Sequence, residues 1–181
     1  WMLKQIGEVK YDFEYDLHAD VFEACAYHYW GLFYSQAKAL AILILGGGVP
    51  KNYSLQPEPT LSQIFLLPDI RGYDYDVQIV SAPVTDGSLS SCFPAEAVSW
   101  GKVNPETYRQ NTESMQADYS TVMPFIIKAL LEDREVLPLC SQRELYKRRE
   151  ELVGTLLNAV RRRKNKIKKT LDFPLQLVVK A

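Results

Sequence analysis

The sequence has few of the residues that build metal sites and disulfide frameworks. It contains two histidines and three cysteines among 181 residues. Cys25, Cys92 and Cys140 form an odd set without a CxxC pair, so neither a disulfide framework nor a zinc site is indicated. His18 and His28 are ten residues apart and share no ligand motif, which favours ordinary helix residues over metal ligands. We therefore expect no metal cofactor and a reducing, cytoplasmic environment.

Long apolar runs are also missing. The longest aliphatic stretch, residues 39–45, is far shorter than the run of about 20 apolar residues that crosses a bilayer. No charged, then apolar, then small-residue leader opens the chain. Both absences argue against a membrane protein. The overall apolar content of 47% is ordinary for a globular protein and sufficient to bury a core.

The net charge is small, at −1, but the basic residues are concentrated near the C-terminus. Residues 161–169, RRRKNKIKK, hold seven of the 21 Lys and Arg residues, which leaves 14 basic against 22 acidic residues and a charge of −8 elsewhere. An acidic body favours polyamines or other cationic partners and argues against nucleic acid as the main ligand. The basic run is interpreted as a solvated helix face or an inter-subunit contact, with a nucleic-acid module as the alternative.

Apolar periodicity predicts alternating strands and helices in the first part of the chain. Residues 1–17 alternate like a strand, residues 16–38 form a helix pattern without Pro, and residues 41–45, AILIL, are typical of a parallel strand buried on both faces. Gly46-Gly47-Gly48 follows at once, where an open α/β sheet lets a ligand approach the backbone. Because the triplet lacks the GxGxxG and Walker spacings, a simple tight turn is the alternative.

The later elements continue this alternation. Ser141 and Glu144 belong to a capping box that begins an amphipathic helix with Leu145, Leu152, Leu156 and Val160 in its apolar stripe, continuing to Lys169. The fold class is therefore α/β, a Rossmann-like open parallel sheet flanked by helices, with a long C-terminal amphipathic helix. The other expected elements are a loop and short helix over 49–67, strands over 77–82 and 115–118, and a helix from Ser120 to Leu131 with Pro124 in its first turn.

Residues 81–102 carry the strongest indication of a site. Pro94 suits the first turn of a short helix and Gly101 suits its end, which places Lys102 just beyond the helix. Glu96 and Trp100 are four residues apart and share a face, so a carboxylate, an indole and an amine converge there. Such a group fits a cationic amine. A solvated lysine near a helix end and a packing tryptophan are the alternatives.

EAVSWGK spans residues 96–102, and LILGGGVPKN spans residues 43–52. These two motifs resemble the deoxyhypusine synthase family, in particular its bacterial deoxyhypusine synthase-like members. The resemblance covers about residues 16–131 and keeps the order and spacing of both motifs. Family members are considerably longer, and this chain opens on Trp1, so we expect a carboxy-terminal half of the family domain over residues 1–135. Residues 136–181 would then be a helical, basic C-terminal extension.

The resemblance implies an NAD-dependent transferase. In the family, NAD accepts hydride from spermidine, a lysine attacks the imine carbon, and an aminobutyl group passes to an acceptor amine. Lys102 corresponds to that lysine, and it would need its pKa lowered to be an uncharged nucleophile. The residues that match substrate contacts are Glu96, Trp100, Gly87, Ser88, Asn52 and Gly47. Those that match NAD contacts are Ser81, Ala82, Asp118 and Tyr119, although Asp118 fits a helix-capping carboxylate equally well.

Two positions depart from the family pattern. Asn52 stands where eukaryotic members carry a His, and an amide cannot act as a general base near neutral pH. Leu89 stands where they carry an Asp, which removes an acceptor for an ammonium group. The acceptor is thus a small-molecule amine or a protein lysine. The leading hypothesis is a cytoplasmic transferase acting on a polyamine in a homotetramer with shared sites; the alternative is a catalytically incomplete, dinucleotide-binding paralogue or regulatory subunit.

Overall fold

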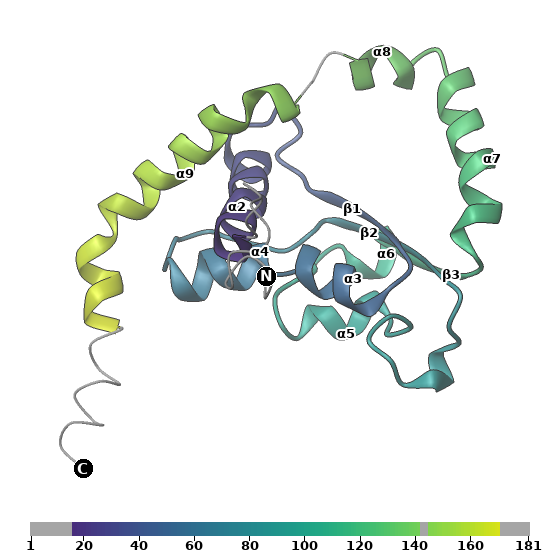
Figure 1. Ribbon diagram of the computed structural model, residues 1–181, viewed down its shortest axis with the longest axis horizontal. Helices are drawn as coiled ribbons and strands as arrows, with labels where there is room; N and C mark the ends of the chain where they lie inside the picture. Colours follow the sequence, from purple (N-terminus) through teal and green to yellow (C-terminus); the bar gives the residue numbers. More distant parts are fainter. Residues whose placement is uncertain (1–15, 142–144, 171–181) are drawn as a thin grey trace, which may run out of the picture.

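The computed structural model describes residues 16–141 and 145–170, which form an open parallel sheet with flanking helices (Figure 1). The α/β fold class is therefore confirmed. The elements are α2 (Leu17–Phe33), β1 (Ala41–Leu45), α3 (Gly48–Ser54), α4 (Pro57–Pro59), η1 (Thr60–Ile64), β2 (Tyr75–Val80), η2 (Val84–Asp86), α5 (Pro94–Val98), α6 (Tyr108–Asn111), β3 (Thr112–Gln116), α7 (Tyr119–Glu132), α8 (Val136–Ser141), η3 (Leu145–Arg148) and α9 (Arg149–Arg162).

The sheet of the described chain has three strands in the order β1-β2-β3, and both pairs are parallel. Leu43 pairs with Val77, which pairs in turn with Glu113. Because all strands point the same way, their carboxyl ends meet at one edge. The turn after β1 and the junctions after β2 and β3 therefore lie at that edge. The predicted parallel strand over 41–45 is confirmed in its position and direction.

Burial on the sheet differs from the prediction. Leu43 and Leu45 are 48% and 37% exposed, so β1 is not buried on both faces, at least against the described residues. In β2 the polar face is the buried one, since Asp76 and Gln78 are both 0% exposed whereas Val77 is 39% exposed. The helices of the described chain cover the polar face of this strand, and the sequence pattern alone does not say which face they cover. β2 also begins earlier than the predicted range 77–82, and β3 earlier than 115–118.

The main apolar core lies where three parts of the chain pack together: α2, α9 and the segment that follows α3. Asp16 caps α2 by accepting a hydrogen bond from the Ala19 amide at 2.9 Å, and the helix ends at Phe33 rather than at the predicted residue 38. Leu152 and Leu156 of α9 are buried and Val160 packs against them, so this part of the predicted apolar stripe is confirmed. Leu145 lies in η3, because α9 begins only at Arg149, so the predicted start of the helix is wrong. The core residues are Cys25, Ala26, Leu61, Leu67, Leu152 and Leu156.

Several predicted helix boundaries are wrong. Residues 49–67 fold as α3, α4 and η1 rather than as a loop and one helix. Asp118, not Ser120, caps α7, because the Asp118 carboxylate accepts a hydrogen bond from the Ser120 amide. Pro124 consequently lies inside α7 rather than in its first turn. The first fifteen residues of the predicted strand over 1–17 and residues 142–144 of the predicted capping box lie outside the described residues.

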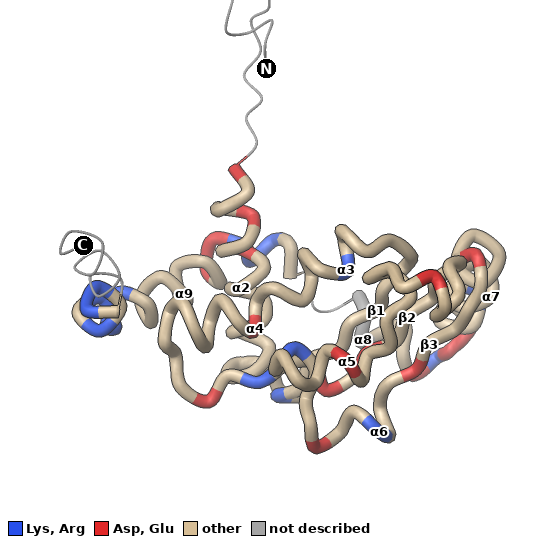
Figure 2. The backbone as a smooth tube through the Cα atoms, turned by 90° about the horizontal axis from the view of Figure 1, so that it is seen from below, with Lys and Arg blue, Asp and Glu red and all other residues tan. Residues whose placement is uncertain are grey.

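Lys and Arg residues gather at the end of α9 (Figure 2). A turn at Arg163 separates α9 from a further helical stretch over 164–170, so the predicted continuous helix is broken there. Among residues 16–141 and 145–170, no helix combines the length and apolarity needed to cross a membrane. The division into a catalytic part over 1–135 and an extension over 136–181 stays a prediction.

Contacts between α2 and α9 predict the effect of truncating an α9 leucine. Leu156→Ala should lower the free energy of unfolding by about 2–5 kcal/mol, because Leu156 is 0% exposed and its removal leaves a cavity. Leu131→Ala on α7 is the matched control: Leu131 is 59% exposed, and the change should stay within about 0.5 kcal/mol. Chemical denaturation measures both, and equal effects would contradict this placement of α9.

Candidate active site

Lys102 is delivered by a short helix and a glycine turn. Phe93 is extended and Pro94 occupies the first helical position of α5, which starts the helix where the sequence predicts it. Gly101 has a φ of 73°, a conformation that residues with a Cβ rarely adopt. A Cβ on Gly101 would also lie 3.0 Å from an oxygen of Glu58. The chain can therefore turn at Gly101, tightly against Glu58, only because this position has no side chain.

A second glycine turn places α3 opposite α5. Gly46 and Gly47 have φ values of 69° and 59°, and they turn the chain from the carboxyl end of β1 into α3. Gly48 lies so close to the next loop that a Cβ there would be 3.2 Å from both Leu89 Cβ and the Ser90 amide. The predicted tight turn is confirmed. It brings the segment that carries Asn52 close to the segment that leads into α5.

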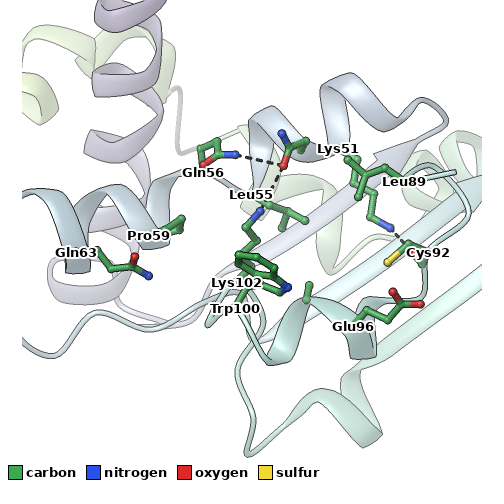
Figure 3. Close-up of a pocket in the computed structure, with 12 residues that line it drawn as sticks. Lys51, Leu55, Gln56, Pro59, Gln63, Leu89, Cys92, Glu96, Trp100 and Lys102 are labelled. Carbon is green, nitrogen blue, oxygen red and sulfur yellow. Dashed lines mark hydrogen bonds between the residues drawn. The ribbon is translucent and has the colours of Figure 1, made fainter.

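A cavity of about 520 Å³ lies between α3 and α5 (Figure 3). Its walls combine an apolar side with amides, one carboxylate and two amines. The residues that line it are Lys51, Asn52, Leu55, Gln56, Pro59, Gln63, Leu89, Cys92, Glu96, Ala97, Trp100 and Lys102. Asn52, Glu96, Trp100 and Lys102, which come from both family motifs, therefore converge on one cavity.

The amine of Lys102 reaches across this cavity to α3. Its Nζ donates a hydrogen bond to Asn52 Oδ1 at 3.3 Å, and Gln56 Nε2 donates to the same oxygen at 3.2 Å (Figure 3). Trp100 lines the same cavity and is 70% exposed. Asn52 thus positions the lysine nitrogen, which is a role that an amide can fill without accepting a proton.

A buried polar network ties the cavity walls to the sheet. Lys51 is 2% exposed, and its Nζ donates to Gln78 Oε1 at 2.7 Å and to the Cys92 carbonyl oxygen. Gln78 Nε2 donates to the same carbonyl at 3.0 Å and to Ser114 Oγ at 2.7 Å. The network joins α3, β2, β3 and the loop before α5. It fixes the distance between the two walls.

Burial shifts the pKa values of three charged side chains around this network. It lowers the pKa of Lys51, while the charges of Cys92, Asp76 and Glu96 oppose that shift. It raises the pKa of Asp76 to about 6, against the charge of Lys51; neither carboxylate oxygen has a hydrogen-bond partner among the described residues. It also raises the pKa of Glu58, against a hydrogen bond from Ser62 and the charge of Lys102. The cavity is therefore underlain by ionisable groups with little access to water.

The residues predicted to contact a dinucleotide lie at the carboxyl edge of the sheet rather than in the cavity lining. Ser81 and Ala82 follow β2, and Asp118 and Tyr119 follow β3. The Tyr119 ring lies 3.7 Å from where a Cβ on Gly46 would be. Asp118 Oδ1 accepts from the Ser120 amide at 2.8 Å, and the hydrogen bonds from Ser120 lower the Asp118 pKa. Its helix-capping role is confirmed.

Three predicted substrate contacts are not among the residues that line the cavity. Gly47 and Gly87 are turn residues with positive φ, and Ser88 Oγ hydrogen-bonds Ser90 Oγ at 2.6 Å.

Both histidines, which were predicted to be ordinary helix residues, lie on α2. His28 Nε2 is 2.8 Å from the Arg71 carbonyl oxygen. His18 lies on the same helix, at an exposed position.

Sequence reasoning missed the groups beneath the cavity. Lys51 lies inside the LILGGGVPKN motif, next to Asn52, and this position could have indicated that it belongs to the site. Asp76 and Gln78 alternate with apolar residues in β2, which is the usual pattern of side chains that face water. Cys92 contributes through its backbone carbonyl, which no residue type reveals. Only the fold shows that these groups meet.

Comparison with known proteins gives one family. A family model described as deoxyhypusine synthase matches residues 1–130. Over 116 residues, 64% of this chain, the chain is 40% identical to the deoxyhypusine synthase-like protein of Thermosynechococcus vestitus and 39% identical to that of Nostoc punctiforme, each covered over 28% of its length. A probable deoxyhypusine synthase of Pyrobaculum calidifontis is 41% identical over 93 residues, 51% of this chain and 28% of that protein. The match thus spans little more than a quarter of these relatives.

Asp76 predicts a pH-dependent stability. Its folded-state pKa of about 6 lies above the ordinary carboxyl value of about 4, so the folded state holds the proton more tightly than the unfolded chain. In acid the carboxyl is protonated in both states and does not change the free energy of unfolding. As the pH rises from about 4 to about 6, its ionisation destabilises the fold increasingly. Asp76→Asn should therefore gain about 1–3 kcal/mol of unfolding free energy relative to the unsubstituted chain between pH 4 and pH 7.

Denaturant titrations at the two pH values measure this gain. Ser114→Ala is the control, since it alters the same buried network without removing an ionisable group. Its difference from the unsubstituted chain should be the same at both pH values. A constant difference for Asp76→Asn would contradict the assignment of Asp76 as a carboxyl that is costly to ionise.

Proposed function

The chain belongs to the deoxyhypusine synthase family, and we propose that it is a transferase that moves an alkylamine group through an imine on Lys102. The observation that carries this proposal is the convergence of Lys102, Glu96 and Trp100 on one cavity within the matched segment. A lysine amine can form the covalent imine, and a carboxylate and an indole can hold a cationic amine beside it.

The cavity supports spermidine or a related polyamine as the donor. Glu96 is the carboxylate of the cavity lining and can pair with an ammonium group of the substrate. Trp100 offers an aromatic face to the same cation. Leu55 and Ala97 supply apolar surface for the methylene chain. A linear alkylamine with a charge at its far end fits this combination of walls.

Lys102 would act by imine exchange. Its neutral amine adds to the carbon of the substrate imine, the bond from that carbon to the original nitrogen breaks, and that nitrogen leaves as a free amine. An acceptor amine then adds to the same carbon and releases Lys102. Asn52, through its 3.3 Å contact with Nζ, would orient the lysine for both additions. The acceptor is a small-molecule amine or a protein lysine.

NAD fits the carboxyl edge of the sheet as the cofactor. The side chains of Ser81, Asp118 and Tyr119 are exposed there, next to a glycine turn that leaves the backbone open. One oxygen of Asp118 caps α7, and its second oxygen can accept a hydrogen bond from a ribose hydroxyl. Ala82 adds apolar surface beside them. When bound, NAD would supply the hydride acceptor that converts the amine to an imine, and its reduced form would return that hydride to the imine formed on the acceptor amine.

A second candidate function is a catalytically incomplete, dinucleotide-binding subunit of a larger oligomer. One observation favours it: Trp100 is 70% exposed at the cavity. Leu89 and Asn52, which line the cavity without a charge, point the same way. In a homotetramer with shared sites, other surfaces would complete the cavity. Copurification of a longer homologue supports this candidate, and unaided turnover refutes it.

Trapping of the covalent adduct tests the leading proposal. Labelled spermidine and NAD are added to the purified protein, and borohydride then reduces any imine to a stable amine. The label should appear on the peptide that contains Lys102, and Lys102→Arg should abolish it and lower turnover by about 10⁴-fold or more. Lys128→Arg, a change on the exposed face of α7, is the control and should label normally. Label on other residues of the protein but not on Lys102 would contradict the proposal.

Glu96 predicts a separate effect on substrate binding. Glu96→Gln keeps the size of the side chain but removes the charge that pairs with the substrate ammonium. The KM for spermidine should rise by about 10- to 100-fold, since a hydrogen bond to a charged group contributes about 1.5–3 kcal/mol. Steady-state kinetics measure the change, and a fall in kcat with an unaltered KM would contradict the assigned role.

A further inference from the structure

Lys51 lines the cavity and has no role in the reaction described above. The inference below rests on that proposed function. A lysine ammonium has a pKa of about 10.4, and an alkylamine of similar basicity enters the cavity protonated at neutral pH. The ammonium must lose a proton before its carbon can give up hydride, because the nitrogen lone pair becomes part of the imine. The cavity therefore needs a proton acceptor.

Four ionisable side chains line the cavity among the described residues: Lys51, Cys92, Glu96 and Lys102. Glu96 pairs with the substrate cation, and Lys102 is the nucleophile. The Cys92 thiol is directed to the Phe93 carbonyl oxygen at 3.6 Å, and burial raises its pKa. The amides of Asn52, Gln56 and Gln63 cannot accept a proton near neutral pH. Lys51 is left as the acceptor.

The hydrogen bonds of Lys51 match a neutral amine. A neutral amine has two N–H donors and one lone pair, whereas an ammonium has three donors. The Nζ of Lys51 has two acceptors, Gln78 Oε1 and the Cys92 carbonyl oxygen, and no third in the described chain. Both N–H groups are used, and the lone pair is free to accept a proton. The same two contacts hold the nitrogen in place before and after protonation.

The charges around Lys51 make its protonation reversible. Asp76 from β2 and Glu96 from α5 favour the ammonium, whereas burial at 2% exposure favours the neutral amine. Burial prevails, so the pKa of Lys51 is lowered from its ordinary value. The Asp76 carboxylate has no hydrogen-bond partner in the described part of the chain and can stabilise the ammonium once it forms. A base whose pKa is moved towards the working pH can take up a proton and release it again.

We propose that Lys51 is the general base of the reaction. Its neutral amine takes a proton from the substrate ammonium, which leaves a neutral substrate amine and an ammonium on Lys51. Nothing is oxidised or reduced in this step. The proton on Lys51 is then available to protonate the amine that leaves on imine exchange. Lys51 thereby supplies the base that Asn52 cannot be.

Two substitutions in the full-length protein test the proposal. Lys51→Arg keeps the hydrogen-bond donors but carries a permanent charge and cannot accept a proton, and Lys51→Ala opens space for an added base. In both, kcat/KM for the formation of NADH from spermidine should fall by about 10²–10⁴-fold, and the rising limb of its pH profile should disappear. Added imidazoles should restore Lys51→Ala in proportion to their basicity. Lys128→Ala is the control and should retain the original profile.

Two further measurements separate this proposal from the proposed function. With a simple alkyl aldehyde in place of the amine, no substrate proton has to be removed, so borohydride should trap Lys102 equally in Lys51→Ala and in the unsubstituted protein. Carbon-13 NMR of labelled lysines, without cofactor, should show a side chain that titrates below the ordinary lysine range and is absent from Lys51→Arg.

The outcomes are distinct. No adduct on Lys102 in the unsubstituted protein overturns the proposed function. An adduct there, together with an unchanged pH profile in Lys51→Arg, overturns the base assignment alone. Loss of activity in Lys51→Ala that no imidazole restores, together with loss of the aldehyde adduct, shows a purely structural role and also overturns it.

Discussion

The buried amine of Lys51 is the contact on which the site depends. It joins Gln78 of the central strand to the carbonyl of Cys92, and Gln78 continues the connection to Ser114. One wall of the cavity is α3 and the other is α5, and this network holds both to the sheet. A buried polar group is costly unless its hydrogen bonds are made, so the network has one satisfied arrangement. The positions of Asn52 and Glu96 on opposite walls follow from it.

Local chemistry explains what the sequence predicts well. Pro94 and Gly101 start and end the helical turn before Lys102, and the leucines of α9 fall on one buried face; both features depend on neighbouring residues only. Burial in β2 was not predictable in the same way. Asp76 and Gln78 alternate with apolar neighbours as exposed side chains do, yet they face the helices, because tertiary packing decides which face of a strand is covered.

The same distinction applies to the candidate site. The spacing of Glu96, Trp100 and Lys102 predicts that they share a region, and the cavity contains all three. The partner of Lys102 is Asn52, fifty positions earlier in the chain, and that contact depends on how α3 packs against α5. The resemblance to a family, not periodicity, brought Asn52 into consideration. The roles of these residues in substrate and cofactor binding stay predictions, since they depend on bound molecules.

The apolar face of the sheet has a consequence for handling the protein. Leu43 is 48% exposed, Leu45 37% and Val77 39%, and the three lie on adjacent strands within the described residues. A contiguous apolar surface of this kind is poorly hydrated and associates with apolar surfaces on other molecules. This apolar sheet face should therefore limit the solubility of the polypeptide at high concentration, whatever the charge on its helices. The fully folded protein should also bind solvatochromic dyes.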